Sequence, residues 1–208
     1  MKVNKPKIMT YEEKSFDDWL EDEEFSNVMI SITPEKELLI SELTFDSCIF
    51  KKIDFNNIKL QDIDLLDVIF ENCDLSNQSF DKKFINRVTF NNCKLIGTTF
   101  IDAAIRDVSF INCNARYINF SGTKINNMLV TDSNFQEASF VEPIVKNISF
   151  ENTNLDKAEF FKTNLKGVDF STSMIALTRF DNYSLKGIIV DSFQCAYLVG
   201  MLGVIVKE

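Results

Sequence analysis

Large apolar residues recur at every fifth position along most of this chain. From Ile40 to Val190, each residue whose number is divisible by five is Leu, Ile, Val or Phe, and Ala115 is the one small exception. In most blocks a small or β-branched residue stands two places earlier, as Cys93 and Val108 do. A period of five fits neither an amphipathic helix nor an alternating strand. The pattern therefore predicts an internal repeat, which must be identified before any single element is assigned.

A second period, of twenty residues, emerges when the central positions of the blocks are compared. One set is all phenylalanine: Phe80, Phe100, Phe120, Phe140, Phe160 and Phe180. The set ten residues away is nearly so: Phe50, Phe70, Phe90, Phe110, Val130, Phe150, Phe170 and Val190. The set between them is mostly aliphatic: Phe45, Leu65, Ile85, Ile105, Ile125, Val145, Leu165 and Leu185. Two opposed aromatic walls with slimmer walls between them would give the core a uniform packing density.

The blocks NCDLS at 72–76, NTNLD at 152–156 and KTNLK at 162–166 resemble the pentapeptide-repeat family, and the resemblance covers residues 36–192. It implies an all-β fold, a right-handed quadrilateral β-helix with four pentapeptides per coil and one on each face. About 155 residues at 20 per coil give near eight coils, a rod on the order of 37 Å long at roughly 4.8 Å per coil. We assign residues 26–190 to this solenoid.

Four residues depart from the pattern at inward positions two places before a block centre: Gln78, Lys83, Pro143 and Tyr183. A buried, unpaired lysine is costly, so we expect residues 76–85 to bulge outward or to carry the charged end of Lys83 to solvent. Because the five-residue register continues, a distortion without a true loop is favoured over a loop. For 141–145 the question stays open.

Both ends of the chain leave the repeat. Residues 1–25 are acidic, but Phe16, Trp19 and Leu20 are spaced to share one helix face, which predicts a helical or irregular cap on the end of the core. The alternative is a solvated acidic tail. Residues 191–208 predict a helix that starts at Asp191 or Ser192 and ends near Gly203, then a short strand at 204–206.

Composition and charge indicate a cytoplasmic protein without a disulfide framework. The chain has 45% hydrophobic and 25% charged residues, 20 phenylalanines and five cysteines, an odd number. We find no apolar run long enough to span a membrane and no secretory signal. The net charge of −9 disfavours direct binding to nucleic acid or to an anionic membrane.

The residues that could carry chemistry point away from an enzyme. The chain has no histidine, the commonest general base and metal ligand. Cys73, Cys93 and Cys113 lie twenty residues apart and stack in a column, which suits buried thiols rather than four ligands converging on zinc. A structural amide ladder is expected from Asn72, Asn92, Asn112, Asp132 and Asn152. Carboxylates at 54, 64, 74 and 169 should face solvent. We predict no catalytic residue, metal or cofactor.

The C-terminal segment is more apolar than one solenoid end can cover, which indicates an interface, although it could also simply close the last coil. It resembles the tails of Qnr and MfpA-like pentapeptide proteins in Gly187, Asp191, Gln194 and Gly203. That resemblance implies an end-to-end homodimer. The predicted dimer interface comprises Phe193, Tyr197, Leu198, Met201, Leu202, Val204 and Val206.

Two functions follow from these observations. The tail resemblance implies a dimeric DNA mimic that binds a type II topoisomerase, DNA gyrase or topoisomerase IV, and modulates quinolone sensitivity. The alternative is a structural or adaptor scaffold for an unidentified protein, because repeats set by packing say little about partners. Mimicry of DNA requires a continuous acidic stripe along the rod. The body of the chain is only mildly acidic, with 21 acids and 17 bases in residues 41–208.

Overall fold

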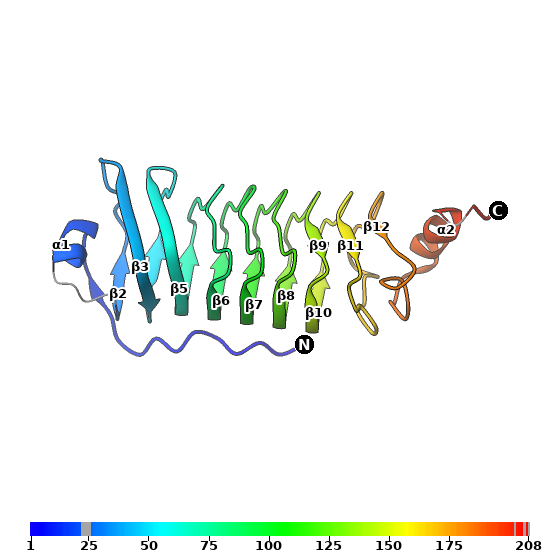
Figure 1. Ribbon diagram of the computed structural model, residues 1–208, viewed down its shortest axis with the longest axis horizontal. Coiled ribbons are helices and arrows are strands. Elements are labelled where there is room, and N and C mark those ends of the chain that lie inside the picture. The colour runs from blue at the N-terminus through cyan, green and yellow to red at the C-terminus, as the bar shows by residue number, and fades with distance from the viewer. Residues whose placement is uncertain (22–25, 202, 206, 208) are drawn as a thin grey trace.

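The protein is a parallel β-solenoid with one helix at each end (Figure 1). The computed structural model describes residues 1–21, 26–201, 203–205 and 207, and the side chains of all these except residues 20, 21 and 201. No helix in these ranges is long and apolar enough to cross a membrane. The predicted quadrilateral β-helix is confirmed.

Short strands stack along the rod and pair in parallel. The strands of the larger sheet are β1 (Glu12–Glu13), β2 (Val28–Ile30), β3 (Leu38–Asp46), β4 (Ile49–Lys51), β5 (Ile58–Glu71), β6 (Phe84–Asn91), β7 (Ala104–Ile111), β8 (Lys124–Thr131) and β10 (Ile144–Glu151). The smaller sheet consists of β9 (Ser139–Val141), β11 (Glu159–Phe161) and β12 (Arg179–Phe180). From β2 onward, paired residues lie twenty apart along most of the ladder, as Phe70, Phe90 and Phe110 do. The twenty-residue coil is confirmed.

The two aromatic walls meet inside the rod as predicted. Within a wall the rings stack: the centroids of Phe90 and Phe110 are 4.9 Å apart, at an interplanar angle of 8°. Across the core the rings meet edge to face, as Phe100 and Phe110 do at 6.2 Å and 85°. All of these side chains are fully buried. Stacked and edge-to-face pairs are the favoured aromatic geometries. The packing of these rings therefore sets the dimensions of the coil.

The corners of the coil require left-handed backbone two places after many block centres. Asn72, Asn92 and Asn112 have φ of 56°, 55° and 52°. Asparagine, aspartate and glycine tolerate this region best. At Gly122, with φ of 67°, a Cβ atom would also lie 2.2 Å from Oδ1 of Asp102. This corner therefore admits no side chain unless its neighbour shifts.

Three of the four departures from the pattern are absorbed without a loop. The side-chain amide of Gln78 donates from Nε2 to the backbone oxygens of Phe55 and Ile58, both at 2.9 Å. Lys83 keeps its charged end at the surface, where Nζ lies 2.6 Å from Oδ1 of Asp62. Pro143 is buried, and irregular pairing between β8 and β10 follows it. No loop interrupts residues 76–85, and the expectation that Lys83 carries its charged end to the surface is confirmed.

The register does slip once, at the fourth departure. Tyr183 was expected to point inward, but it is 53% exposed, and the buried residue is Ser184. The backbone N–H of Thr163 donates to Oγ of Ser184 at 3.0 Å. A tyrosine side chain is too large for a site that holds Ala103, Thr123, Pro143 and Thr163 in the preceding coils, so a turn over residues 182–187 shifts the inward position by one.

The N-terminal residues form two structures instead of one cap. Helix α1 (Phe16–Glu21) closes the first coil, with Phe16 and Trp19 buried against Phe50. Residues 1–11 instead run back along the rod, across the strands and as far as β10 (Figure 1). We call residues 1–11 the N-terminal strap. Two backbone N–H groups attach it: that of Lys7 donates to Asp67 at 2.8 Å, and that of Asn4 to Asp107 at 3.3 Å.

At the other end, helix α2 (Ser192–Met201) begins at the predicted position. Asp191 caps it: its Oδ1 accepts from the backbone N–H of Gln194 at 2.8 Å. The strand predicted over 204–206 stays a prediction, because Val204 and Ile205 are assigned to no strand in this single chain. Both are exposed, at 54% and 89%, and neither has a ladder partner in the described chain. Residue 206 lies outside the described residues.

Candidate interaction surfaces

The cysteine column is structural, as predicted. The thiols of Cys73, Cys93 and Cys113 donate to the backbone oxygens of Phe50, Phe70 and Phe90, at 3.3, 3.3 and 3.4 Å. Burial raises the pKa of the fourth buried thiol, Cys48, to about 12. A thiol with such a pKa is a poor nucleophile. Among the described residues, no group of three His, Cys, Asp or Glu side chains could hold a metal ion.

The carboxylates one place before a block centre also have structural roles. Asp74 accepts from the backbone N–H of Ser76 at 3.0 Å and from Nζ of Lys94 at 2.8 Å. Partial burial opposes ionisation, yet these hydrogen bonds hold the pKa of Asp74 below its ordinary value. Asp54 and Asp169 likewise accept from the backbone two residues on. These local turns fix the corners and require no ligand.

The expected amide ladder is present in part. The side-chain amide of Asn92 donates to Asn72, and that of Asn152 donates to Asp132 at 3.1 Å. These residues lie at corners with positive φ. Asn and Asp suit this position because they tolerate the left-handed backbone and because their side chains form the coil-to-coil hydrogen bond. The structure supports no binding role for them.

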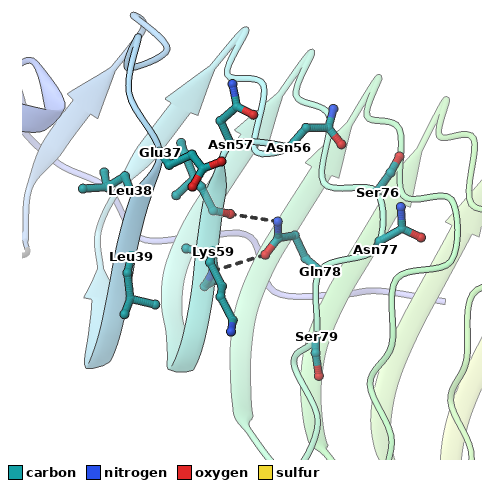
Figure 2. Close-up of a pocket in the computed structure, with 12 residues that line it drawn as sticks. Glu37, Leu38, Leu39, Asn56, Asn57, Lys59, Ser76, Asn77, Gln78 and Ser79 are labelled. Carbon is teal, nitrogen blue, oxygen red and sulfur yellow. Dashed lines mark hydrogen bonds between the residues drawn. The ribbon is translucent and has the colours of Figure 1, made fainter.

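A groove of about 650 Å³ lies on three successive coils near the N-terminal end (Figure 2). Its walls include Glu37, Lys59, Ser76 and Asn77, and Gln78 reaches across its floor to the neighbouring coil. Because Gln78 completes backbone hydrogen bonds there, its polar group is already satisfied. In the described lining, no nucleophilic side chain is hydrogen-bonded to a base, which favours a structural role for this groove.

The outer surface has four faces, which we name by their central residue in one coil: face A at Ile105, face B at Phe110, face C at Ala115 and face D at Phe120. Over residues 38–192, face A has seven bases and four acids, and face B has two bases and five acids. Face C has three bases and four acids, and face D has four bases and seven acids. The net charges are +3, −3, −1 and −3, so no face is strongly acidic along the rod.

Of the eleven basic residues in 38–192 that lie outside the face-A blocks from residue 103 onward, seven pair with an acid in a neighbouring coil. The pairs are Lys51–Glu71, Lys83–Asp62, Arg87–Asp67, Lys94–Asp74, Arg116–Glu137, Lys162–Glu142 and Arg179–Glu159. Such pairs at the surface contribute little to stability, with a median near 0–1 kcal/mol. Their effect is to neutralise the cations on these surfaces.

The edge between faces A and B is a polar ladder under the N-terminal strap. Arg87 forms a two-pronged pair with Asp67, at 2.6 Å from Nε and 2.5 Å from Nη2. Asp107 accepts from Nδ2 of Asn127 at 2.9 Å and from Nδ2 of Asn4 at 3.0 Å. Both carboxylates are buried, at 5% and 4% exposure. The strap thus covers a preformed strip of hydrogen-bond acceptors.

The predicted dimer residues divide between cap and surface. Leu198 is buried and Tyr197 packs against the core, so both serve to close the last coil. Phe193 and Val204 are exposed, at 87% and 54%. Met201 ends α2, and nothing is described of its side chain; residues 202 and 206 lie outside the described residues. Sequence reasoning missed Ile189 and Ile205, which are 49% and 89% exposed beside these residues in the chain.

Sequence reasoning also missed the strap, whose anchors lie 60 and 103 residues away in the chain. Residues 1–11 contain three lysines and no acid, and this contrast with the acidic residues that follow was the available signal. Sorting the charges by their position within the twenty-residue coil would likewise have found the excess of bases on face A.

Comparisons with known proteins agree with this architecture. The model of the family described as a pentapeptide repeat region matches residues 63–140 and, one coil later, 83–160. None of the curated proteins matches the chain. A trypsin-treated point variant of QnrB1, a plasmid-mediated fluoroquinolone resistance protein, aligns with a TM-score of 0.54 and 21% identity, over 99% of this chain and 94% of that chain. A second such variant gives 0.51 and 22%, over 88% and 89%.

A more distant solved structure is HetL, a pentapeptide repeat protein involved in heterocyst differentiation regulation from the cyanobacterium Nostoc sp. It has 13% identity and a TM-score of 0.41, over 80% of this chain and 89% of that chain. At these identities the likeness to QnrB1 is one of fold. Activity and partners must be argued from the surface of this chain.

Proposed function

This chain is a pentapeptide-repeat protein, and we propose that it is a rod that binds a protein partner and performs no catalysis. The observation that supports the proposal is the difference between the interior of the rod and its outer surface. The interior is filled by phenylalanine rings and small side chains, whose polar groups bond to the backbone. No described residues combine a nucleophile, a base and a pocket. What varies from coil to coil is the outer surface, which is where recognition must occur.

A homodimer through the C-terminal segment is part of this proposal. Phe193, Ile205 and Val204 present apolar surface at the end of the rod, beyond the contacts that close the last coil. Water would otherwise solvate these side chains, so burial against a second copy would be favourable. A strand at 204–206 would also find its ladder partner in that second copy. The dimer would place two rods end to end and double the binding surface.

A type II topoisomerase is the partner that the tail resemblance implies, and the exposed apolar tail supports it. The version in which the rod mimics DNA fits less well. Duplex DNA carries one negative charge per roughly 1.7 Å of helix axis. Faces B and D each have a net charge of only −3 over residues 38–192. The charge distribution therefore favours an adaptor over a DNA mimic.

A supercoiling assay separates the two. Gyrase activity is measured with and without micromolar protein, each with and without a quinolone. Inhibition of supercoiling, or protection from the quinolone, would identify the partner as a topoisomerase. If the protein changes supercoiling neither in the presence nor in the absence of the quinolone, the adaptor proposal stands alone. It is then tested by photo-crosslinking from surface positions in cells: one recurrent crosslinked protein supports it, and no crosslinked protein contradicts it.

A further inference from the structure

Eight exposed basic side chains gather on one side of this acidic protein. Five lie on face A, in the coils from 103 to 187, and three lie on the N-terminal strap along its edge. The set is Lys2, Lys5, Lys7, Arg106, Lys124, Lys146, Lys166 and Lys186. We call it the basic strip. The only acid in the same segments, taken as residues 1–11 and the five face-A blocks, is Asp107. A net charge of +7 thus faces one side of a chain whose total is −9.

The strap belongs to this surface because its path is fixed. Asn4 holds both carboxylate oxygens of Asp107, and Lys7 holds Asp67. Met1 borders a hollow together with Lys146 and Lys166. Val3, Pro6 and Ile8 are partly buried, so Lys2 and Lys5 face outward. The strap therefore adds charge to the face and does not neutralise it.

Within the part of the chain that the structure describes, the cations of the strip form no direct ion pair. None of the eight is within ion-pair distance of a described carboxylate, whereas seven cations elsewhere on the rod are. Along face A, Lys146 and Lys166 lie twenty residues, or one coil, apart; Asn126 pairs with Asn147, and Gly187 lies against Lys166. Like charges stacked at roughly 4.8 Å repel each other. A ligand that carries negative charge would relieve this repulsion.

We propose that the basic strip is the docking surface for an acidic, partly apolar polypeptide segment of a partner protein. Besides the cations, the face exposes Ile144 and Phe84, at 65% and 46%. Ile144 pairs with Lys124 in the strand register, so an apolar and a basic side chain are neighbours. An alternating acidic and apolar segment matches this arrangement, and the five rungs of the face span roughly 19 Å, the length of about six extended residues.

The same observations disfavour a nucleic acid. A duplex or a long single strand would extend beyond the five rungs and meet the acidic remainder of the protein, where residues 12–37 alone hold ten acids and two bases. No aromatic side chain lies among the last five blocks of face A except Tyr183, so a stacking platform for bases is lacking there. A short acidic polypeptide fits within the five rungs and needs no stacking platform.

The test uses fluorescence anisotropy of a labelled twelve-residue peptide of alternating Glu and Leu with the full-length protein in about 50 mM salt. The strip variant is Lys146→Glu with Lys166→Glu. Its matched control is Lys82→Glu with Lys157→Glu, which changes the net charge equally at exposed positions on faces D and C. We expect the strip variant to bind at least tenfold more weakly and the control to stay within twofold. Thermal unfolding should be the same for both variants.

Three results would overturn the inference. These are no binding of the peptide to the wild-type protein, equal binding of the peptide by both variants, or tighter binding of a 20-base-pair duplex with the same dependence on Lys146 and Lys166. A peptide with Gln in place of Glu should bind more weakly than the acidic one. The inference rests on the proposed binding function but fails separately: a crosslinked protein partner insensitive to the strip variant would leave that function intact.

Discussion

Phe110 lies at the centre of the rod, and its truncation to alanine tests how the core holds the coils together. The ring stacks on Phe90 at 4.9 Å and meets Phe100, Phe120 and Phe135 edge to face at 6.2, 6.0 and 5.4 Å. On its other side along the wall stands the smaller Val130. The side chain is fully buried, so its removal leaves a cavity that the rigid coils above and below cannot close.

The expected cost is large. Truncation of a buried phenylalanine typically costs about 3–5 kcal/mol, and each lost ring pair adds roughly 0.5–1.5 kcal/mol in a non-additive way. We therefore expect the free energy of unfolding to fall by about 4–5 kcal/mol. In a solenoid, stability is close to a sum over neighbouring repeats, so a central lesion should also uncouple the two ends.

Two spectroscopic signals in one urea titration separate these effects. The single tryptophan, Trp19, is buried against Phe16, Phe45 and Phe50 and reports the N-terminal end, whereas far-UV circular dichroism reports all coils. In Phe110→Ala the two midpoints should separate. The control is Phe84→Ala, an outward residue that is 46% exposed. If Phe110→Ala costs less than about 1.5 kcal/mol, or no more than Phe84→Ala, the reasoning about the aromatic wall is wrong.

Three further predictions concern other parts of the chain. Phe193→Glu should convert a dimer to a monomer in light scattering without a change in thermal stability; an unchanged mass would refute the tail interface. An aromatic disulfide reagent at pH 8 should titrate one thiol, Cys195, in the native protein and all five after unfolding, because thiols such as Cys48 are buried; several fast native thiols would contradict this. Burial raises the pKa of Asp67, but the hydrogen bonds and charges of Arg87 and Lys7 together outweigh it and lower that pKa overall. Its stabilisation is therefore present above the unfolded pKa of about 3.9 and is lost as pH falls toward the folded value. Urea midpoints at pH 7 and pH 3 should differ less in Arg87→Met than in the wild type, and equal differences would count against the pair.

The solenoid was predictable because its interior is written in the sequence at fixed intervals. Phe100, for example, stacks on the phenylalanines twenty residues before and after it. The period of the sequence therefore also gives the pairing of residues between coils. The exception at Tyr183 shows the limit of this reasoning. Its block centre, Leu185, still packs against the core, but the tyrosine is too large for the inward site, so a turn brings Ser184 inside instead.

The strap was not predictable from the pattern. Residues 1–11 have no periodicity of their own, and Asn4 and Lys7 bind carboxylates that look like ordinary corner residues in the sequence. The strand expected at 204–206 stays a prediction for a related reason. A strand requires a partner, and the sequence shows the propensity of Val204 and Ile205 without showing the neighbour.

The outward positions carry what distinguishes this rod from others of its fold. Core requirements restrict the block centres and the residues two places earlier, but they leave the flanking positions free. On face A those positions hold Arg106, Lys124, Lys146 and Lys166, unpaired, while elsewhere cations such as Lys94 sit opposite an acid one coil away. Core packing does not depend on these charges, so it does not explain why they are segregated. Their segregation is the expected result if one side of the rod binds an acidic partner and the others do not.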